Sequence, residues 1–268
     1  MLTSKQNPKV KYFSSLRNKK KRGEEGRFII EGIHLVEEAL SKGLLERAIY
    51  GKNLLKTSEG SALFSRMIKA NIPIEEASDN IVRYLSDVET PQGIIASVKP
   101  RMSDLGSLFD VDDPLIVVAC GIQDPGNLGT IIRTASAAGC SGLILTKGTA
   151  DPYNEKSIRA STGSIFHLNM VKIDDIITLI PSLKRRGIKV VSGFTDAPKT
   201  YFEADYRGPT AIVIGSEGQG LPRELLGLSD ESVSIPMSGN TESLNAAISA
   251  AVILYEALRQ RRICAGEH

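Results

Sequence analysis

Cysteine, histidine and long hydrophobic runs are scarce in this chain of 268 residues. The cysteines, Cys120, Cys140 and Cys264, are odd in number and lack the paired spacing of a disulfide framework. They therefore predict reduced thiols, as in a cytoplasmic protein. The three histidines are scattered without metal-ligand spacing, so no metal is expected. No window approaches the roughly 20 apolar residues that cross a bilayer, which argues against a membrane protein.

The N-terminal segment is rich in lysine and has no apolar core, so we do not expect a secretory signal there. Residues 1–27 contain nine lysines and arginines against two glutamates, a net charge of +7 within a total of +2. A basic arm on a mildly acidic body indicates a polyanionic partner. A solvated, partly disordered terminus and a targeting presequence are alternatives that the sequence leaves open.

The length fits two modest domains or one large one, and an apolar fraction of 41% is typical of a protein with a real core. Residues 1–104 alternate short apolar runs with amphipathic stretches, which predicts a small α/β sandwich. We expect strands at 27–32, 48–50, 72–74 and 93–98, and helices at 10–21, 33–41, 61–70 and 81–85. A proline- and aspartate-containing linker follows and leads to a second domain at 112–268.

The second domain opens with a continuous apolar run at 115–120, typical of a parallel strand that is buried on both faces. We expect further strands at 143–146, 166–170, 188–192, 210–214 and 233–235, and helices at 127–138, 154–161 and 174–186. Three of these strands lead into polar loops. In an open α/β sheet, ligands bind at loops beyond the carboxyl ends of strands.

The first polar loop is the segment 123–136, QDPGNLGTIIRTAS. Asn127 lies near the expected helix start, and Arg133 lies further along an otherwise apolar helix. Burying an arginine there is costly unless it meets an anion or a carboxylate. An exposed arginine on the solvent face is the alternative.

The second polar loop is the segment 212–222, IVIGSEGQGLP, with three glycines in six residues. Without a Cβ, such a backbone approaches a ligand closely. The glycine order differs from that of dinucleotide-binding folds, which argues against a nucleotide-dependent oxidoreductase. Glu217 is a candidate to anchor backbone amides or to accept from a ligand. A generic glycine-rich turn is the alternative.

The third polar loop is the segment 235–247, IPMSGNTESLNAA, which joins a strand to the last helix. Thr241 or Asn240 is the expected N-cap of that helix. Ser243 and Asn245 are polar residues in a region that otherwise reads as core. A stripe at 3–4 spacing predicts the buried face of this helix, with the members Leu244, Ala247, Ile248, Ala251, Tyr255 and Leu258.

Together the three segments resemble the motifs of the SpoU (TrmH) family of RNA ribose 2′-O-methyltransferases, in the family's order. The first domain is similar to the substrate-binding domain of that family at residues 28–32, FIIEG, and 89–96, ETPQGIIA. The resemblance implies a parallel sheet whose C-terminal part is threaded into a deep trefoil knot. It also implies a first domain like kink-turn-binding ribosomal proteins.

The resemblance implies that S-adenosylmethionine is held in the knot, without a metal. The adenine side would be walled by residues 192–195. The cofactor-contacting residues would be Thr195, Gly215, Gly220, Ile235 and Leu244. The catalytic set would be Arg133, Asn127, Glu217, Ser243 and Asn245. Family precedent assigns activation of the ribose hydroxyl to the arginine. Because a neutral arginine is costly, we interpret Arg133 as an electrostatic clamp on phosphate and alkoxide, and leave proton abstraction open.

The function that the resemblance implies is methyl transfer to a ribose 2′-hydroxyl of structured RNA, with ribosomal RNA of the 23S type as the favoured substrate and no DNA partner. A cytoplasmic homodimer whose active site includes residues of both subunits is expected. Two alternatives stay open at this point: a tRNA 2′-O-methyltransferase, and a non-catalytic RNA-binding or ribosome assembly factor with the same fold.

Overall fold

The computed structural model describes residues 1–100, 103–239 and 241–266. The chain forms two compact units, one made of Met1–Pro100 with Tyr153–Phe166 and the other of Arg101–Pro152 with His167–His268. The first unit is thus discontinuous in sequence, which no pattern in residues 153–166 indicated. The assignment of 1–104 and 112–268 as functional domains stays a prediction. Within the described residues, no helix is long and apolar enough to cross a membrane.

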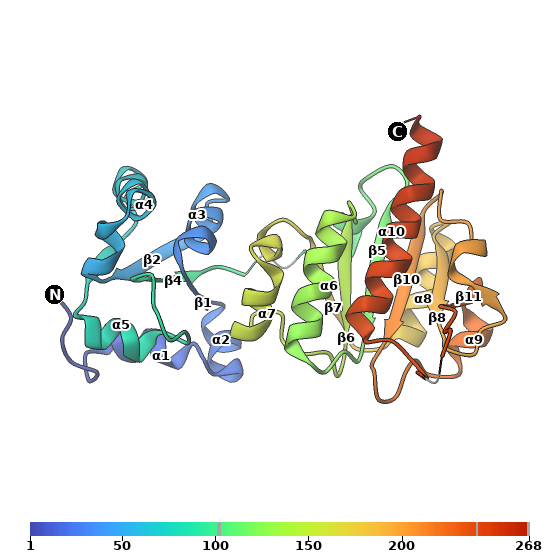
Figure 1. Cartoon of the computed structure of the whole chain (residues 1–268), viewed down its shortest axis with the longest axis horizontal. Coiled ribbons are helices and arrows are strands. Elements are labelled where there is room, and N and C mark those ends of the chain that lie inside the picture. Colours follow the sequence, from blue (N-terminus) through green and yellow to red (C-terminus); the bar gives the residue numbers. More distant parts are fainter. Residues whose placement is uncertain (101–102, 240, 267–268) are drawn as a thin grey trace. The chain divides into compact units, whose positions relative to one another are not determined.

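The first unit contains a four-stranded sheet with the order β1-β4-β2-β3 (Figure 1). The central strand β4 pairs antiparallel with β1 and β2, and β2 pairs parallel with β3. The strands are β1 (Phe28–Glu31), β2 (Leu45–Tyr50), β3 (Ile74–Glu76) and β4 (Ile94–Val98). The helices that follow them in turn are α3 (Ile33–Ser41), α4 (Ser58–Lys69) and α5 (Asp79–Leu85). The expected alternation of strands and helices is confirmed.

The basic N-terminal segment is folded as two helices, α1 (Pro8–Ser15) and α2 (Lys19–Glu25). Val10, Phe13 and Leu16 are buried in the core of the unit. The side chain of Asn18 caps α2 by accepting hydrogen bonds from the amides at 20 and 21. A solvated, disordered terminus is therefore the wrong interpretation of this segment, because its apolar face is part of the core.

Residues 153–166 join the first unit through aromatic packing. The ring of Phe28 stacks on Tyr153 at 4.5 Å and on Phe166 at 6.3 Å between centroids. The segment contains α7 (Glu155–Ser161) and a 3₁₀ turn at Ser164–Phe166. We expected a strand at 166–170, but the observed strand β7 spans Met170–Ile173. The prediction is wrong at its start because Phe166 belongs to the 3₁₀ turn and packs on Phe28.

The second unit contains a seven-stranded parallel sheet with the order β7-β6-β5-β10-β8-β11-β9. The apolar run at β5 (Leu115–Cys120) is buried along its whole length, as predicted. The strands other than β5 and β7 are β6 (Gly142–Thr146), β8 (Lys189–Gly193), β9 (Lys199–Thr200), β10 (Thr210–Gly215) and β11 (Glu231–Ser234). The helices are α6 (Pro125–Ala137), α8 (Ile176–Arg185), α9 (Leu225–Leu228) and α10 (Ala246–Ala265).

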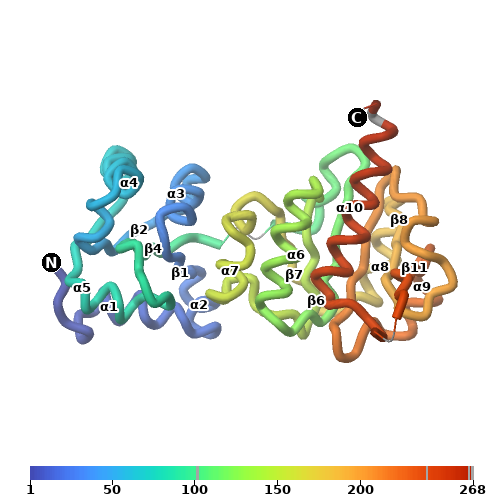
Figure 2. The backbone as a smooth tube through the Cα atoms, in the orientation of Figure 1, coloured from blue at the N-terminus to red at the C-terminus, as the bar shows by residue number. Residues whose placement is uncertain are grey.

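Helices cover both faces of this sheet. Leu179 and Leu183 of α8 share an apolar cluster with Ile116 and Val118 of β5. On the other face α6 packs against α10, and α10 against β10 (Figure 1). The loops after β10 and β11 gather at one end of the sheet, as the backbone trace shows (Figure 2). The α/β architecture is confirmed, and the threading of the chain into a knot stays a prediction.

The last helix differs from the expectation at its start and in its buried face. Asn245, and not Thr241, is the N-cap, and its side-chain oxygen accepts from the amides at 247 and 248; Asn240 lies outside the described residues. Ile248 and Tyr255 are 50% and 52% exposed, so the predicted stripe is wrong at these positions. The buried face is formed largely by small residues that let α10 approach its neighbours closely, namely Ala246, Ala247, Ala250, Ile253, Leu254 and Ala257.

The burial of Phe13 gives a test of the N-terminal segment as part of the core. We expect Phe13→Ala to destabilise the first unit by about 3–5 kcal/mol, because a fully buried ring is replaced by a cavity. The neighbouring exposed Lys11→Ala should change stability by less than about 0.5 kcal/mol. Urea denaturation followed by circular dichroism measures both, and equal midpoints for Phe13→Ala and wild type would contradict the assignment.

Candidate active site

Three loops that are far apart in sequence meet at the carboxylate of Glu217. Its Oε1 accepts hydrogen bonds from the Nδ2 of Asn127, from the Nδ2 of Asn245 at 3.2 Å and from the backbone amide of Ala246 at 3.4 Å. The two asparagines also bond to each other, with Asn245 Nδ2 3.0 Å from Asn127 Oδ1. The structure therefore brings one residue from each of the three predicted motifs into a single cluster, which we call the Glu217 cluster.

Helix starts position two members of this cluster. The carboxylate of Asp124 caps α6 by accepting from the amide of Asn127 at 2.9 Å, which fixes the first turn of that helix. Asn245 caps α10 with its Oδ1 and uses its Nδ2 for the cluster. A carboxylate beside the first amides of α10 is also favoured by the helix dipole. The local fold at two helix N-termini thus sets the geometry of the cluster.

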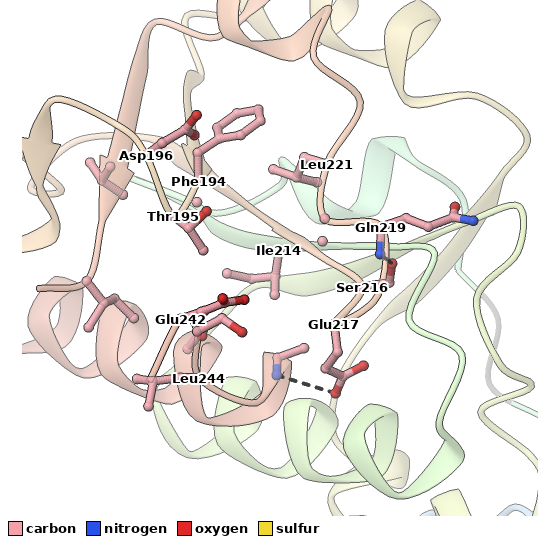
Figure 3. A pocket seen from close by; sticks show the side chains of 18 of the residues that line it. Phe194, Thr195, Asp196, Ile214, Ser216, Glu217, Gln219, Leu221, Glu242 and Leu244 are labelled. Atoms are coloured by element: carbon pink, nitrogen blue, oxygen red, sulfur yellow. Dashed lines mark hydrogen bonds between the residues drawn. The ribbon is translucent and has the colours of Figure 1, made fainter. Parts of the chain in front are cut away.

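A cavity of 360 Å³ adjoins the cluster, between the carboxyl ends of β8 and β10 and the segment that follows β11 (Figure 3). The residues predicted to contact a cofactor all line it: Thr195, Gly215, Gly220, Ile235 and Leu244. Glu217 and Ser243 of the predicted catalytic set line it as well. Ser192 does not; it is buried, with its hydroxyl 2.6 Å from that of Ser229.

The glycine loop of this cavity is tight because of its backbone geometry. A Cβ added at Gly215 would lie 2.5 Å from the carbonyl carbon of Gly220 and 2.6 Å from its oxygen. Gly220 itself has φ +65°, and its amide donates to the Ser216 carbonyl at 2.9 Å. Both glycines are therefore required to close the turn, which explains their spacing in the sequence.

Three charged residues at the cavity were not identified from the sequence. Asp196 and Glu242 bring carboxylates to it, and Arg223 donates from Nη1 to Asp196 at 2.7 Å. This hydrogen bond lowers the pKa of Asp196. The only sequence signal was the position of Asp196 directly after Thr195, in a loop that follows a strand. A cavity with carboxylates and apolar walls suits a ligand that carries both positive charge and apolar surface.

Arg133 is exposed on α6 and makes no hydrogen bond or ion pair with another described residue. It does not line the cavity of Figure 3. Of the two interpretations left open, the exposed arginine is the one observed in the single chain. Of the predicted catalytic set, Asn127, Glu217 and Asn245 meet in the Glu217 cluster, and Ser243 lines the adjoining cavity. Arg133 makes no hydrogen bond to any of them.

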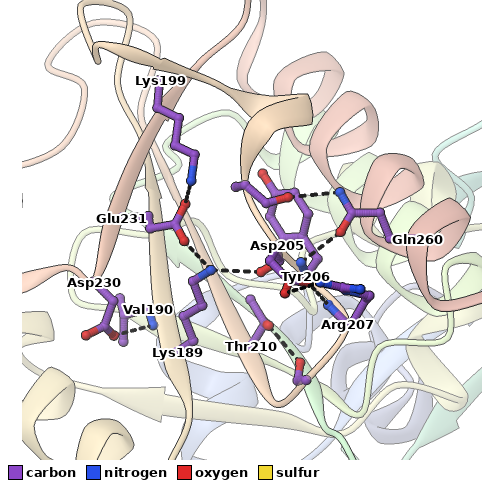
Figure 4. Close-up of polar contacts among 12 residues, drawn as sticks. Lys189, Val190, Lys199, Asp205, Tyr206, Arg207, Thr210, Asp230, Glu231 and Gln260 are labelled. Carbon is purple, nitrogen blue, oxygen red and sulfur yellow. Dashed lines mark hydrogen bonds and ion pairs between the residues drawn. The ribbon is translucent and has the colours of Figure 1, made fainter. Parts of the chain in front are cut away.

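Ion pairs connect strands β8, β9 and β11 near the cavity (Figure 4). Glu231 of β11 lies between Lys189 of β8 and Lys199 of β9, with 2.6 Å to the latter. Burial acts to raise the pKa of Glu231, but the hydrogen bonds from both ammonium groups outweigh it and lower that pKa. Gln260 of α10 donates to the carbonyl at 204 and accepts from the amide of Tyr206, each at 2.9 Å. Sequence patterns gave no sign of these long-range contacts.

Comparison with known proteins matches both units. The family model described as SpoU rRNA Methylase family matches residues 114–255, and that of the MRM3-like substrate binding domain matches residues 7–96. The chain is 34% identical over 254 residues to the 23S rRNA (guanosine(2553)-2′-O)-methyltransferase RlmP of Bacillus subtilis, covering 95% of this chain and 97% of that protein.

A second relative is the 23S rRNA (uridine(2479)-2′-O)-methyltransferase of Streptomyces viridochromogenes, with 34% identity over 92% of this chain and 87% of the relative. Among solved structures, the AdoMet-bound rRNA methyltransferase of Sinorhizobium meliloti superposes with a TM-score of 0.86 at 31% identity, over 96% of this chain and 97% of that one. The motif resemblance is thereby confirmed across both units, and the protein belongs to the SpoU rRNA methylase family.

Proposed function

We propose that this protein transfers the methyl group of S-adenosylmethionine to a ribose 2′-hydroxyl of ribosomal RNA. The observation that carries the proposal is the Glu217 cluster, which joins all three motif loops beside a cavity with carboxylates and apolar walls. The names of both relatives specify 23S rRNA, which favours ribosomal RNA over tRNA. Retention of the complete motif set argues against a non-catalytic assembly factor. A ribosomal RNA substrate also implies that the enzyme acts in the cytoplasm.

The cavity fits the proposed cofactor in chemistry. Ile235 and Leu244 offer apolar surface for the adenosine part, and the backbone at Gly215 and Gly220 is open to close approach. The carboxylate of Asp196 or Glu242 suits the positive charges of the sulfonium and amino groups. When bound, the cofactor supplies an electrophilic methyl group for in-line displacement by the ribose oxygen.

The residues of this chain would contribute alignment and charge. Asn127, Glu217 and Asn245 are hydrogen-bonded to one another. The segments that border the methyl group would therefore be held in fixed positions relative to one another. Ser243 would position the ribose hydroxyl. The guanidinium of Arg133 is best suited to stabilise the phosphate and the developing alkoxide electrostatically. Proton abstraction would then fall to solvent or a neighbouring group.

Methyl transfer and the role of Arg133 can be tested together. Wild-type protein, labelled S-adenosylmethionine and unmodified total RNA should yield a single 2′-O-methyl site in ribosomal RNA, located by primer extension. Arg133→Ala should lower transfer by about 100-fold or more, as for removal of an electrostatic stabiliser, with unchanged cofactor affinity. Arg133→Lys should recover little of the methyl-transfer rate lost in Arg133→Ala, because lysine lacks the planar guanidinium that binds two oxygens at once. No methylation by wild type would overturn the function; full activity of Arg133→Ala would overturn the role.

The glycine loop gives a matched pair of variants. Gly215→Ala should weaken S-adenosylmethionine binding at least tenfold, because the added Cβ would meet the backbone of Gly220 and displace the loop. Gly218 lines the same cavity, but a Cβ added there has no atom within 4 Å. Gly218→Ala should therefore bind S-adenosylmethionine within about twofold of the wild-type affinity. Isothermal titration calorimetry measures both, and equal affinities would contradict the loop assignment.

The exposed face of α10 supports a homodimer. Ile248 and Tyr255 are half exposed, and Ala251 and Leu258 lie between and after them at helical spacing. A row of apolar residues on an otherwise buried helix is typical of a subunit interface. Exposed Arg133 lies on the adjacent α6, so a partner copy seated on this face could complete the site with its own residues.

Sedimentation velocity tests the dimer. The wild type should sediment as a dimer, and Tyr255→Asp should sediment as a monomer because a charge is buried in the interface without a partner. Leu55→Asp, an equally exposed apolar position in the first unit, should remain dimeric. A monomeric and active wild-type enzyme would rule out a shared active site.

The basic N-terminal segment offers fewer phosphate contacts than its composition suggested. Lys9, Arg17, Lys21 and Arg27 are paired with glutamates of the same unit. The exposed cations of this segment that remain for RNA phosphates are Lys5, Lys11, Lys19 and Lys20. Lys5 lies over the Tyr84 ring at 4.5 Å, and Lys20 has a distant glutamate at 4.0 Å. Phe13 is buried and cannot stack on a base.

A further inference from the structure

A second cavity, of 300 Å³, lies within the first unit and takes no part in the methyl-transfer site. It is enclosed by β1, the start of α3, the segment 85–92 and α7. Its apolar walls come from five secondary-structure elements, β1, α3, α5, β4 and α7. Their side chains are nearly all buried: Ile30, Leu85, Ile95 and Ile158, with the half-buried Leu35. Val88 and Thr90 are exposed at its edge.

The polar lining of this cavity includes three carboxylates, and hydrogen bonds or ion pairs hold each of them in place. Glu31 accepts from the hydroxyl of Ser86 at 2.5 Å and from the amide of Asp87 at 3.0 Å. Asp87 is paired with Arg159, the one cation among the residues that line the cavity. A carboxylate has about four lone-pair sites, so acceptor capacity remains after these contacts.

Glu155 adds a third carboxylate, and it is the most enclosed. Its Oε1 is buried and lies 3.2 Å from the Nε of Arg17, a distance that makes an ion pair, although the angle makes no hydrogen bond. Burial raises the pKa of Glu155, against the opposing charge of Arg17. Glu155 is therefore held by an ion pair, and it lines the cavity as a third carboxylate.

Two sequence segments of the first unit, FIIEG and ETPQG, form one wall of the cavity. Gly32 has φ +100° and cannot cap α3 with a side chain, so the Oε1 of Gln92 accepts from the amide of Ile33 at 2.8 Å instead. A Cβ on Gly32 would lie 2.9 Å from that oxygen. The wall is therefore set before any ligand binds, as expected of a preformed site.

The chemistry of the cavity selects its occupant. Two of the three carboxylates are paired with arginines, but carboxylates still outnumber the one arginine of the lining, and this net negative charge disfavours a phosphate. Buried aliphatic side chains favour a flat apolar ring. Acceptors at the edge favour a ring that carries N–H groups. Unpaired nucleobases have this combination, and proteins recognise them by apolar contact with the ring and hydrogen bonds to the edge. The family model of this region is that of a substrate-binding domain.

We propose that the cavity of the first unit holds one unpaired base of the RNA substrate, with its N–H edge toward the carboxylates of Glu31, Asp87 and Glu155. Guanine, adenine and cytosine, which carry amino groups, should bind in preference to uracil. This inference rests on the proposed function, because it requires an RNA substrate. It assigns base recognition to a site separate from the methyl-transfer cavity.

Val88→Trp tests the site by filling its mouth from an exposed position. Filter binding with unmodified ribosomal RNA should show at least a tenfold loss of affinity, with unchanged thermal midpoint and cofactor affinity. The control is Val111→Trp, at a valine of the second unit that is 51% exposed against 40% for Val88; this variant should bind RNA within twofold of wild type. Thr90→Trp at the same edge serves as the second blocking variant if Val88→Trp does not fold.

Base preference is measured with fluorescein-labelled UUGUU, UUAUU, UUCUU and UUUUU by anisotropy. The three oligonucleotides with an amino-bearing base should bind wild type more tightly than UUUUU, and Val88→Trp should remove the difference. Unchanged RNA affinity in both blocking variants would overturn the inference. So would binding of labelled pentalysine that is lost in Val88→Trp while RNA affinity is kept, since a basic protein segment would then be the occupant.

These outcomes are independent of catalysis. Affinity lost in Val88→Trp supports the cavity even if no methylated product forms, in which case the proposed function fails alone. Methylation by wild type, with the same KM for RNA in Val88→Trp, would instead leave the function standing and overturn the base site.

Discussion

The candidate active site of the second unit depends on the carboxylate of Glu217, which connects its three motif segments. One oxygen accepts from Asn127 in the first turn of α6, from Asn245 at the cap of α10 and from the first amide of α10. Glu217 is exposed, so these bonds contribute modest free energy. Their effect is on position, because they fix two helix N-termini relative to the glycine loop.

Much of the fold follows from the sequence because its signals are local. The apolar run of β5 and the helix α3 were predicted with their observed bounds, and the motif loops follow strands as expected. The start of α10 was placed too early, since the polar residues before Asn245 offered several caps of similar quality. Its buried face was predicted with the wrong phase because large residues such as Tyr255 were taken as core, whereas alanines are what let α10 pack closely.

The sequence indicated the motif residues that the structure brings to the Glu217 cluster and its cavity, but it did not indicate their contacts or the charged residues Asp196, Glu242 and Arg223. The motif residues could be identified individually, but hydrogen bonds between Asn127 and Asn245, 118 residues apart, have no local signature. Charge was similarly misleading in the N-terminal segment. Its nine basic residues suggested an arm available to RNA, whereas several of them are neutralised by glutamates that come later in the chain. Ion pairs of this kind depend on tertiary structure, so a net charge cannot reveal them.

The return of residues 153–166 to the first unit has a consequence for how this protein could be divided or recombined. Phe28 packs on Tyr153 and Phe166, so a fragment that ends near residue 104 lacks two rings of its own aromatic cluster. The chain passes between the units at three points in its sequence. Exchange of the substrate-binding part between relatives therefore cannot proceed by a single crossover. A functional chimera must carry α7 together with the N-terminal segment, and the two parts are constrained to change together in evolution.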